Sequence, residues 1–283
     1  MNSNYPLIGM DIGGTNARAG LVENGQLTHL ESIPIKSNGT VKEVLEQIFD
    51  LIDRVKTAAV NGIGIAFPSI MDVEKGIVFD VQNIPAWKEV HLKEIIEQRY
   101  GLPVRINNDA NCFALGEKYF GQGQDYRHLV GLIVGTGLGA GIVIDGKIHS
   151  GANGGAGEFG MIPYRDKYLE YYCSGQFFDN HGNKSGNRLA SAATTGDKDA
   201  LAIFKVFGHH FGQAIKIIQY TIDPEIIILG GSVRKAFPFF KDSMWKALEN
   251  FAFISSLKNI RIAISEDDYI AILGAAALHM SKG

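Results

Sequence analysis

Two glycine-rich segments of the chain have the composition of phosphate-binding turns. One is Gly13-Gly14-Thr15 and the other is Gly135-Thr136-Gly137. Glycine lets backbone N–H groups approach an anionic phosphate because no Cβ obstructs them, and the hydroxyl of Thr15 adds a donor. A single Gly-Gly turn is more often structural, but the presence of two such turns predicts a nucleotide-binding site.

Two carboxylates follow predicted strands, at positions where they could take part in phosphoryl transfer. Asp11 ends the first apolar strand, where its carboxylate could hold a water molecule on a Mg²⁺ ion bound to the phosphates. Asp109 lies in the segment Asn107-Asn108-Asp109-Ala110-Asn111, at the start of an expected helix. Such polar residues often only cap a helix. Because phosphoryl transfer needs a base near the attacking hydroxyl, we expect Asp109 to be that base.

The two turns belong to a repeated pattern. Residues 7–27 and 129–148 each read as an apolar strand, a glycine-rich turn, a second apolar strand and a tight hairpin turn, at Asn24-Gly25 and at Asp145-Gly146. With an offset of one residue the hydrophobic positions coincide, which indicates a duplicated domain. We expect the nucleotide to bind in a cleft between the two halves.

Strands and helices alternate along the rest of the chain. In the first half the periodicity predicts a helix over 41–55, a strand over 62–67, a helix over 92–100, a short strand over 104–106 and a helix over 110–119. In the second half we expect a loop-rich region over 150–188, a helix over 200–221, a strand over 226–229 and a helix over 270–279. This order predicts an α/β fold of two duplicated domains, a smaller one over 1–107 with the C-terminal helix 269–283 and a larger one over 108–268.

A dinucleotide-binding fold is the rival interpretation of the second turn. Residues 135–140 fit the fingerprint G-x-G-x-x-G/A after an apolar strand. That fingerprint opens a helix, whereas residues 141–146 read as a strand that closes in a hairpin. The context therefore weakens a dehydrogenase assignment, and no Gly-Lys-Ser or Gly-Lys-Thr follows either turn, as a Walker loop requires.

Composition narrows the class of protein. The chain has 283 residues, of which 46% are apolar, and 27 basic against 30 acidic residues give a net charge of -3. Without a basic run, a nucleic-acid partner is not expected. The two cysteines, Cys112 and Cys173, are too few for a disulfide framework. With neither a signal peptide nor an apolar stretch of membrane-spanning length, we expect a cytoplasmic protein without a membrane partner, and a homodimer is the default assembly.

The order of the motifs resembles the ROK sugar kinases (repressor, open reading frame, kinase). The resemblance is carried by segments along nearly the whole chain, which are 11–15, 108–111, 114–117, 135–139, 155–160, 229–232 and 273–276. It implies an actin-like ATPase fold and ATP- and Mg²⁺-dependent phosphorylation of a hexose or hexose derivative, with the sugar held between closing lobes.

The resemblance also implies roles for individual residues. Asn108 and Asp109 would bind sugar hydroxyls, and Asp109 would act as general base. Glu158 matches the sugar-binding glutamate of the family, and Glu170 lies in a segment similar to the one that supplies a second glutamate. Gly230-Gly231-Ser232 would border the adenosine.

The chain departs from the family pattern at Met161. The family usually has a histidine there, followed by a cysteine-rich loop, and that histidine and three cysteines bind structural zinc. Here residues 162–168 form a short segment without cysteine. A thioether cannot replace imidazole as a zinc ligand, and the cysteine thiolates that would complete the site are absent, so we expect no zinc site. We also expect Met161 to make the wall next to the sugar more apolar.

A sugar-responsive regulator is the alternative function. Repressors of the family carry a helix-turn-helix ahead of the first glycine turn, and only ten residues precede Asp11. The alternative is therefore a catalytically weak sugar sensor without a DNA-binding domain. Such a sensor would have little reason to keep both Asp11 and Asp109.

Overall fold

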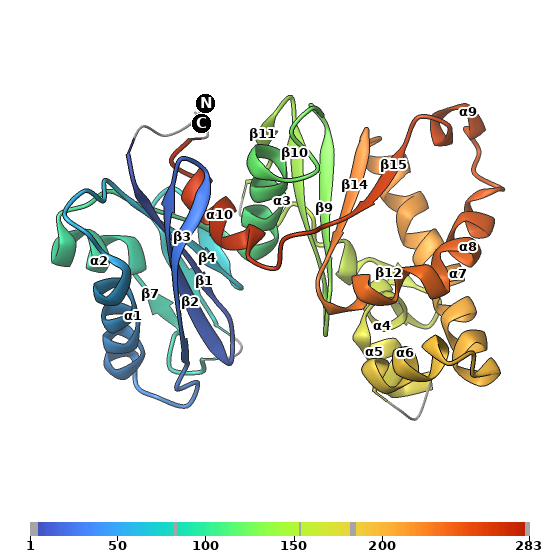
Figure 1. Cartoon of the computed structure of the whole chain (residues 1–283), viewed down its shortest axis with the longest axis horizontal. Helices are drawn as coiled ribbons and strands as arrows, with labels where there is room; N and C mark the ends of the chain where they lie inside the picture. Colours follow the sequence, from blue (N-terminus) through green and yellow to red (C-terminus); the bar gives the residue numbers. More distant parts are fainter. Residues whose placement is uncertain (1–4, 82–83, 153, 182–184, 281–283) are drawn as a thin grey trace. The chain divides into compact units, whose positions relative to one another are not determined.

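A computed structural model describes residues 5–81, 84–152, 154–181 and 185–280. The chain divides into two compact units (Figure 1). Unit 1 comprises Met1–Arg127, Gly141–Ala156 and Glu266–Gly283, and unit 2 comprises His128–Ala140 and Gly157–Ser265. Among the described residues no helix combines the length and apolar character that a bilayer span requires.

Unit 1 is built on a mixed sheet with the strand order β3-β2-β1-β4-β8. Its strands are β1 (Leu7–Ile12), β2 (Asn16–Glu23), β3 (Gln26–Pro34), β4 (Ile63–Phe67) and β8 (Val104–Asn108). The first three strands are antiparallel, and β4 and β8 continue the sheet parallel to β1. The hairpin between β2 and β3 turns at Asn24 (φ 53°) and Gly25 (φ 78°), as the Asn-Gly pair predicts.

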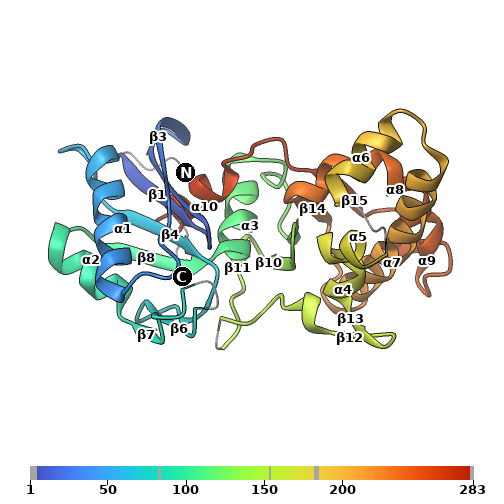
Figure 2. The ribbon, with the colours of Figure 1, turned by 90° about the horizontal axis from the view of Figure 1, so that it is seen from below.

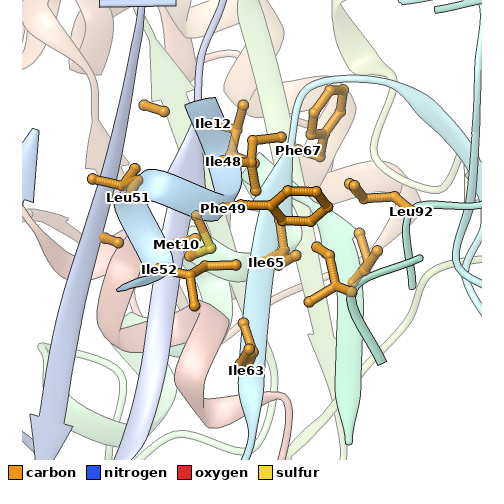
Figure 3. Close-up of a cluster of buried hydrophobic side chains, with 14 of the residues drawn as sticks. Met10, Ile12, Ile48, Phe49, Leu51, Ile52, Ile63, Ile65, Phe67 and Leu92 are labelled. Carbon is orange, nitrogen blue, oxygen red and sulfur yellow. The ribbon is translucent and has the colours of Figure 1, made fainter. Parts of the chain in front are cut away.

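Helices cover both faces of this sheet. One face carries α1 (Val41–Val55) and α2 (Leu92–Tyr100), and the other carries α3 (Asp109–Phe120) and α10 (Ile270–Ala277) (Figures 1 and 2). Thr40 begins α1 with a reciprocal capping box to Glu43, and Gly101 ends α2 in the left-handed conformation (φ 65°). A hydrophobic core fills the space under α1, with Met10, Ile48, Phe49, Ile65 and Phe67 among its side chains (Figure 3).

The backbone of α10 packs unusually close to its neighbours in unit 1. A Cβ at Gly64 on β4 would lie 1.8 Å from the carbonyl oxygen of Ala275. A Cβ at Gly274 would lie 1.7 Å from the carbonyl oxygen of Cys112 on α3. Glycine at these two positions therefore lets α10 fit between the sheet and α3, the helix that begins at Asp109.

The second sheet repeats the order of the first. Its order is β11-β10-β9-β14-β15, from strands β9 (Leu129–Val134), β10 (Leu138–Ile144), β11 (Lys147–Ile148), β14 (Ile226–Gly230) and β15 (Arg261–Ile264). Strands β9, β14 and β15 are parallel, and Asp145 (φ 52°) and Gly146 (φ 78°) form the hairpin turn. The duplicated α/β architecture predicted from the two hairpins is confirmed.

Unit 2 also contains helices beyond the repeat. The long helix α7 (Lys198–Thr221) packs along α8 (Phe237–Leu248), and α9 (Ile254–Leu257) follows. The region expected to be loop-rich contains short elements, which are η1 (Phe159–Met161), β12 (Pro163–Tyr164), β13 (Lys167–Tyr168), α4 (Leu169–Cys173), α5 (Gly175–His181) and α6 (Gly186–Thr194). The expectation of loops was wrong there because buried aromatic side chains, such as Phe177 and Phe178, fix these short helices.

Some elements were not predicted from the sequence. In unit 1, β5 (Ile70–Asp72), β6 (Ile77–Phe79) and β7 (Glu89–Val90) form a separate small sheet, and η2 (Ser232–Ala236) follows β14 in unit 2. Helix α3 belongs to unit 1 because it packs on α10 and β4. The proposed domain boundary between residues 107 and 108, as the junction of two evolutionary halves, stays a prediction.

Candidate active site

The first glycine turn, residues 13–15, joins β1 to β2. The N–H of Gly13 donates to the carbonyl oxygen of Asn16 at 2.9 Å, which closes the turn. The N–H of Ile35 donates to the carbonyl oxygen of Thr15 at 2.9 Å, which fixes its other side. The side chain of Thr15 is exposed, so its hydroxyl is available to a ligand.

The charge of Asp109 acts on Asp11 within unit 1. Asp11 lies next to the end of β1, Asp109 is the first residue of α3, and both are half-buried. Burial, with a contribution from the charge of Asp109, raises the pKa of Asp11 to about 6, although Arg18 opposes the shift. Burial also raises the pKa of Asp109. Two carboxylates with raised pKa values at the end of a sheet form a site that favours protons or cations.

An amide network fixes the position of Asp109. The N–H of Ala110 donates to Oδ1 of Asn108, which caps α3, and to Oδ1 of Asp109, both at 2.9 Å. Behind them, buried Asn107 accepts from the N–H of Asn108 at 2.8 Å and from Nδ2 of Asn111 at 2.9 Å. Asn107 Nδ2 donates to Ser150 Oγ at 3.3 Å. The strand-to-helix junction is therefore held by side chains before any ligand is bound.

The second glycine turn, residues 135–137, joins β9 to β10 in unit 2. The N–H of Gly135 donates to the carbonyl oxygen of Gly137 at 3.0 Å. The junction of α4 and α5 supports the turn through two hydrogen bonds. Ser174 Oγ donates to the carbonyl oxygen of Thr136 at 2.9 Å, and the N–H of Gly175 donates to the carbonyl oxygen of Gly135 at 2.7 Å. The side chain of Thr136 is exposed.

Glu170 contacts this second turn directly. Its Oε2 accepts the N–H of Leu138 at 2.9 Å, and its Oε1 accepts Nε2 of Gln176 at 2.8 Å. A Cβ at Gly137 would lie 2.7 Å from Oε2 of Glu170, so glycine is required for this approach. Glu170 thus links the proposed sugar-binding set to the phosphate turn of the same unit.

Glu158 lies in a sharp bend of unit 2. It is exposed and comes directly before η1. The preceding Gly157 has φ 97°, and a Cβ there would lie 2.0 Å from the carbonyl oxygen of Ala140. The bend therefore needs glycine and presents the carboxylate of Glu158 at the surface of unit 2.

The segment proposed for adenosine follows β14. Gly231 has φ 77°, and a Cβ there would lie 2.3 Å from the carbonyl oxygen of Val134 at the end of β9. Arg234 donates to the carbonyl oxygens of Gly231 at 2.9 Å and of Ser265 at 3.1 Å. Gly230, Gly231 and Ser232 are thereby held next to the strand that leads into the second glycine turn.

The segment after Met161 is a tight hairpin. Strands β12 and β13 pair directly, with Arg165 at φ 57° in the turn, and Met161 is 53% exposed. Cys112 and Cys173 are both buried. In the described ranges no group of three or more His, Cys, Asp or Glu residues has a metal-binding arrangement. The expected absence of zinc stays a prediction.

The predicted site residues divide between the two units. Unit 1 holds Asp11, Gly13, Gly14, Thr15, Asn108 and Asp109. Unit 2 holds Gly135, Thr136, Gly137, Glu158, Glu170, Gly230, Gly231 and Ser232. The supporting residues Asn107, Ser174 and Gln176 were not predicted. Asn107 could have been found from its place in the polar segment 107–111, whereas no sequence signal connects Ser174 or Gln176 with the glycine turn.

Comparison with known proteins shows the family of the chain. A sequence profile described as the ROK family matches residues 7–282. The chain is 29% identical to the glucokinase of Thermotoga maritima over 96% of either chain, and 30% identical to the xylose repressor of Caldicellulosiruptor bescii over 97% of this chain and 78% of the repressor. Its structure is similar to that of a ROK family glucokinase from Streptomyces griseus in complex with glucose and AMPPNP, with a TM-score of 0.78, 27% identity and coverage of 96% of this chain and 98% of that chain.

Sequence and structure therefore agree on the architecture and on the family. The duplicated sheets form the actin-like ATPase fold found in sugar kinases. The matched region includes both glycine turns and the Asp109 junction. The chain belongs to the ROK family, as a glucokinase-like member without the cysteine-rich zinc loop.

Proposed function

We propose that the chain transfers the γ-phosphoryl group of ATP to a hydroxyl of a hexose or hexose derivative. The observation that carries the proposal is the pair formed by Asp11, near the end of β1, and Asp109, at the start of α3. The charge of Asp109 contributes to the raised pKa of Asp11, which lies beside the first glycine turn. The similarity to a glucokinase crystallised with glucose and AMPPNP supports this choice of substrates.

Asp109 is the general base in this proposal. Its Oδ1 accepts the N–H of Ala110, which leaves Oδ2 to accept the proton of the attacking sugar hydroxyl. Its raised pKa makes the carboxylate a better proton acceptor than an ordinary aspartate. Asn108, Glu158 and Glu170 bind other hydroxyls of the sugar, because carboxylate and amide oxygens each accept hydrogen bonds.

The two glycine turns hold the phosphates, and Gly230, Gly231 and Ser232 border the adenosine. Both turns have exposed threonine side chains, Thr15 and Thr136. The carboxylate of Asp11 fits Mg²⁺, since it makes no ion pair among the salt bridges of the described residues and lies near a second carboxylate. Mg²⁺ supplies neutralisation of the phosphate charge when it is bound. Asp11 would hold this ion through a bound water molecule.

A coupled assay of ADP formation tests the proposal. The assay supplies Mg-ATP with glucose, mannose, fructose, N-acetylmannosamine or N-acetylglucosamine in turn. The proposal expects one of these sugars to be consumed well above the others. ADP formation that none of the sugars increases above the background would oppose it.

A sugar-responsive regulator is a second candidate. The 30% identity to a xylose repressor favours it. A regulator of this kind would bind sugar with an affinity independent of ATP and would form little or no ADP. Calorimetric titration of the sugars, run beside the ADP assay, separates the two functions, because only a kinase combines saturable sugar binding with turnover.

A further inference from the structure

Unit 2 contains an open pocket whose lining includes none of the residues assigned to phosphoryl transfer. Its volume is about 530 Å³, and it is lined by Arg165, Lys205, Val206, His209, His210, Ser243, Lys246, Ala247 and Asn250. The walls come from α7, α8 and the β12–β13 hairpin, which lies beside α4 and α7 (Figure 2). This volume falls in the usual range for sites that bind small molecules.

The charged residues in the lining are all basic. Arg165, Lys205 and Lys246 contribute positive charge, and Asp or Glu does not occur among the lining residues. None of the salt bridges within the described parts of the chain involves these three side chains. Asp166 follows Arg165 in the chain. The hydrogen bond from the hydroxyl of Tyr172, with the charges of Lys167 and Arg165, lowers the pKa of Asp166. Arg165 therefore shares its charge with Asp166, whereas Lys205 and Lys246 are available to a ligand.

A buried lysine adds to the positive potential behind the pocket. Lys216 on α7 is only 8% exposed, and its ammonium group donates to Oδ1 of Asn250. This bond occupies the oxygen of Asn250, so the amide group that lines the pocket has its Nδ2 donors left for a ligand. A buried ammonium whose partner is a neutral amide also favours an anion nearby.

His210 is a buried, hydrogen-bonded residue of the pocket lining. It is 5% exposed, and its Nδ1 shares a hydrogen bond of 3.0 Å with the hydroxyl of Tyr164 on the hairpin. Burial, together with positive charge from Arg165, His209 and His181, lowers the pKa of His210 to about 4. Tyr164 fixes the position of the neutral ring. A bound anion would offset the positive charge around it.

We propose that this pocket binds a small organic anion, whose oxyanion head group contacts Lys205, Lys246 and Arg165 and whose apolar body packs on Val206 and Ala247. Phosphate and carboxylate head groups share the required chemistry, since both accept charge-assisted hydrogen bonds from these donors. The hairpin that carries Arg165 replaces the segment in which the family pattern has its zinc loop.

Calorimetric titration of the full chain tests the site. The probes are phenyl phosphate, benzoate, inorganic phosphate and, as the neutral analogue, phenol. We expect saturable binding of one phenyl phosphate or benzoate per chain, weaker binding of inorganic phosphate, and none of phenol at the same concentrations. Comparison of phenyl phosphate with benzoate identifies the preferred head group.

Substitutions locate the binding. Lys205→Gln and Lys246→Gln replace exposed helical residues, and each should weaken phenyl phosphate binding by about tenfold through loss of a charge-assisted contact. The matched control is Lys241→Gln, an exposed lysine of α8 outside the pocket, and it should leave the affinity unchanged. In the unsubstituted chain, bound phenyl phosphate should also raise the pKa of His210, observed in the proton NMR signal of its ring.

The site is refuted if the organic anions do not saturate the protein at millimolar concentration, or if phenol binds equally well. Binding that the two pocket substitutions leave unchanged would place the anion elsewhere, for example on a glycine turn, and would also overturn the proposal. These outcomes are independent of sugar phosphorylation, because the titration contains neither sugar nor ATP.

Discussion

The carboxylate of Glu170 accepts the backbone N–H of Leu138 at 2.9 Å, so a residue of α4 fixes the end of the second glycine turn. Glu170→Ala would leave this N–H without its partner, at a cost of about 1–3 kcal/mol of stability. Because the same turn is proposed to hold phosphate, the KM for ATP should rise as well. Urea unfolding and ATP-dependent kinetics measure the two effects.

Glu46→Ala is the matched control for Glu170→Ala, since Glu46 is an exposed residue of α1. It should change the free energy of unfolding by less than about 0.5 kcal/mol. Equal effects of the two substitutions would show that the contact between Glu170 and Leu138 contributes nothing specific.

Substitution of Gly274 tests the close packing of α10 on α3. In Gly274→Ala the new methyl group would lie 1.7 Å from the carbonyl oxygen of Cys112, so the helices must separate. We expect a loss of at least about 1–3 kcal/mol in the free energy of unfolding, measured in urea. Gly155→Ala is the control, because its methyl group would meet no atom within 4 Å. Similar stability of both variants would contradict the packing described for α10.

The repeated hairpins could be predicted because Asn24-Gly25 and Asp145-Gly146 require positive φ at both positions, and few other structures accept them. Helix α1 was predicted with its observed bounds because its apolar residues have a regular helical period, and the structure shows Thr40 as its cap. Helix α8 was missed because it begins with Phe237 and Pro238 and has no side-chain cap that marks its start.

Candidate site residues could be proposed from the sequence where they are close along the chain. Asp109 and Asn108 lie in a single polar segment at a strand end, and their roles stay predictions. The support that Glu170 gives to Leu138 joins residues 32 positions apart, and it depends on the packing of α4 against the turn. Such contacts arise from tertiary structure and leave no periodic pattern in the chain.

The raised pKa of Asp11 predicts a pH-dependent stability difference. Its pKa is about 6 in the folded protein against an ordinary value of 3.8, so between these values the folded state retains a proton that the unfolded state releases. The stability contributed by this group is present at low pH and is lost as the pH rises toward 6. The Asp11→Asn variant does not lose this stability as the pH rises, because asparagine does not titrate.

The stability of Asp11→Asn relative to the unsubstituted chain should therefore increase between pH 4 and pH 7, by up to about 3 kcal/mol. Urea unfolding at several pH values measures the difference. A difference that stays constant over this range would mean that Asp11 titrates normally.

Substitution of Met161 tests the effect of having methionine where the family usually has histidine. Met161→His adds one imidazole at an exposed position beside a hairpin without cysteine. We expect kcat/KM to change by about tenfold for at least one sugar, because the new group adds or removes a hydrogen bond to a hydroxyl. Metal analysis should find no stoichiometric zinc. Tightly bound zinc, or identical kinetics with every sugar, would be the contrary result.

The role of Asp109 is tested most directly by the turnover of Asp109→Asn with Mg-ATP and the preferred sugar. Asparagine keeps the size of the side chain and can still accept the N–H of Ala110, but it cannot accept the proton of the sugar hydroxyl. The control is Asp242→Asn, at an exposed residue of α8. We predict that kcat falls by about 10²–10⁴-fold in Asp109→Asn while AMPPNP binding and the control variant stay unchanged. Full turnover in Asp109→Asn would contradict the assignment of Asp109 as the base.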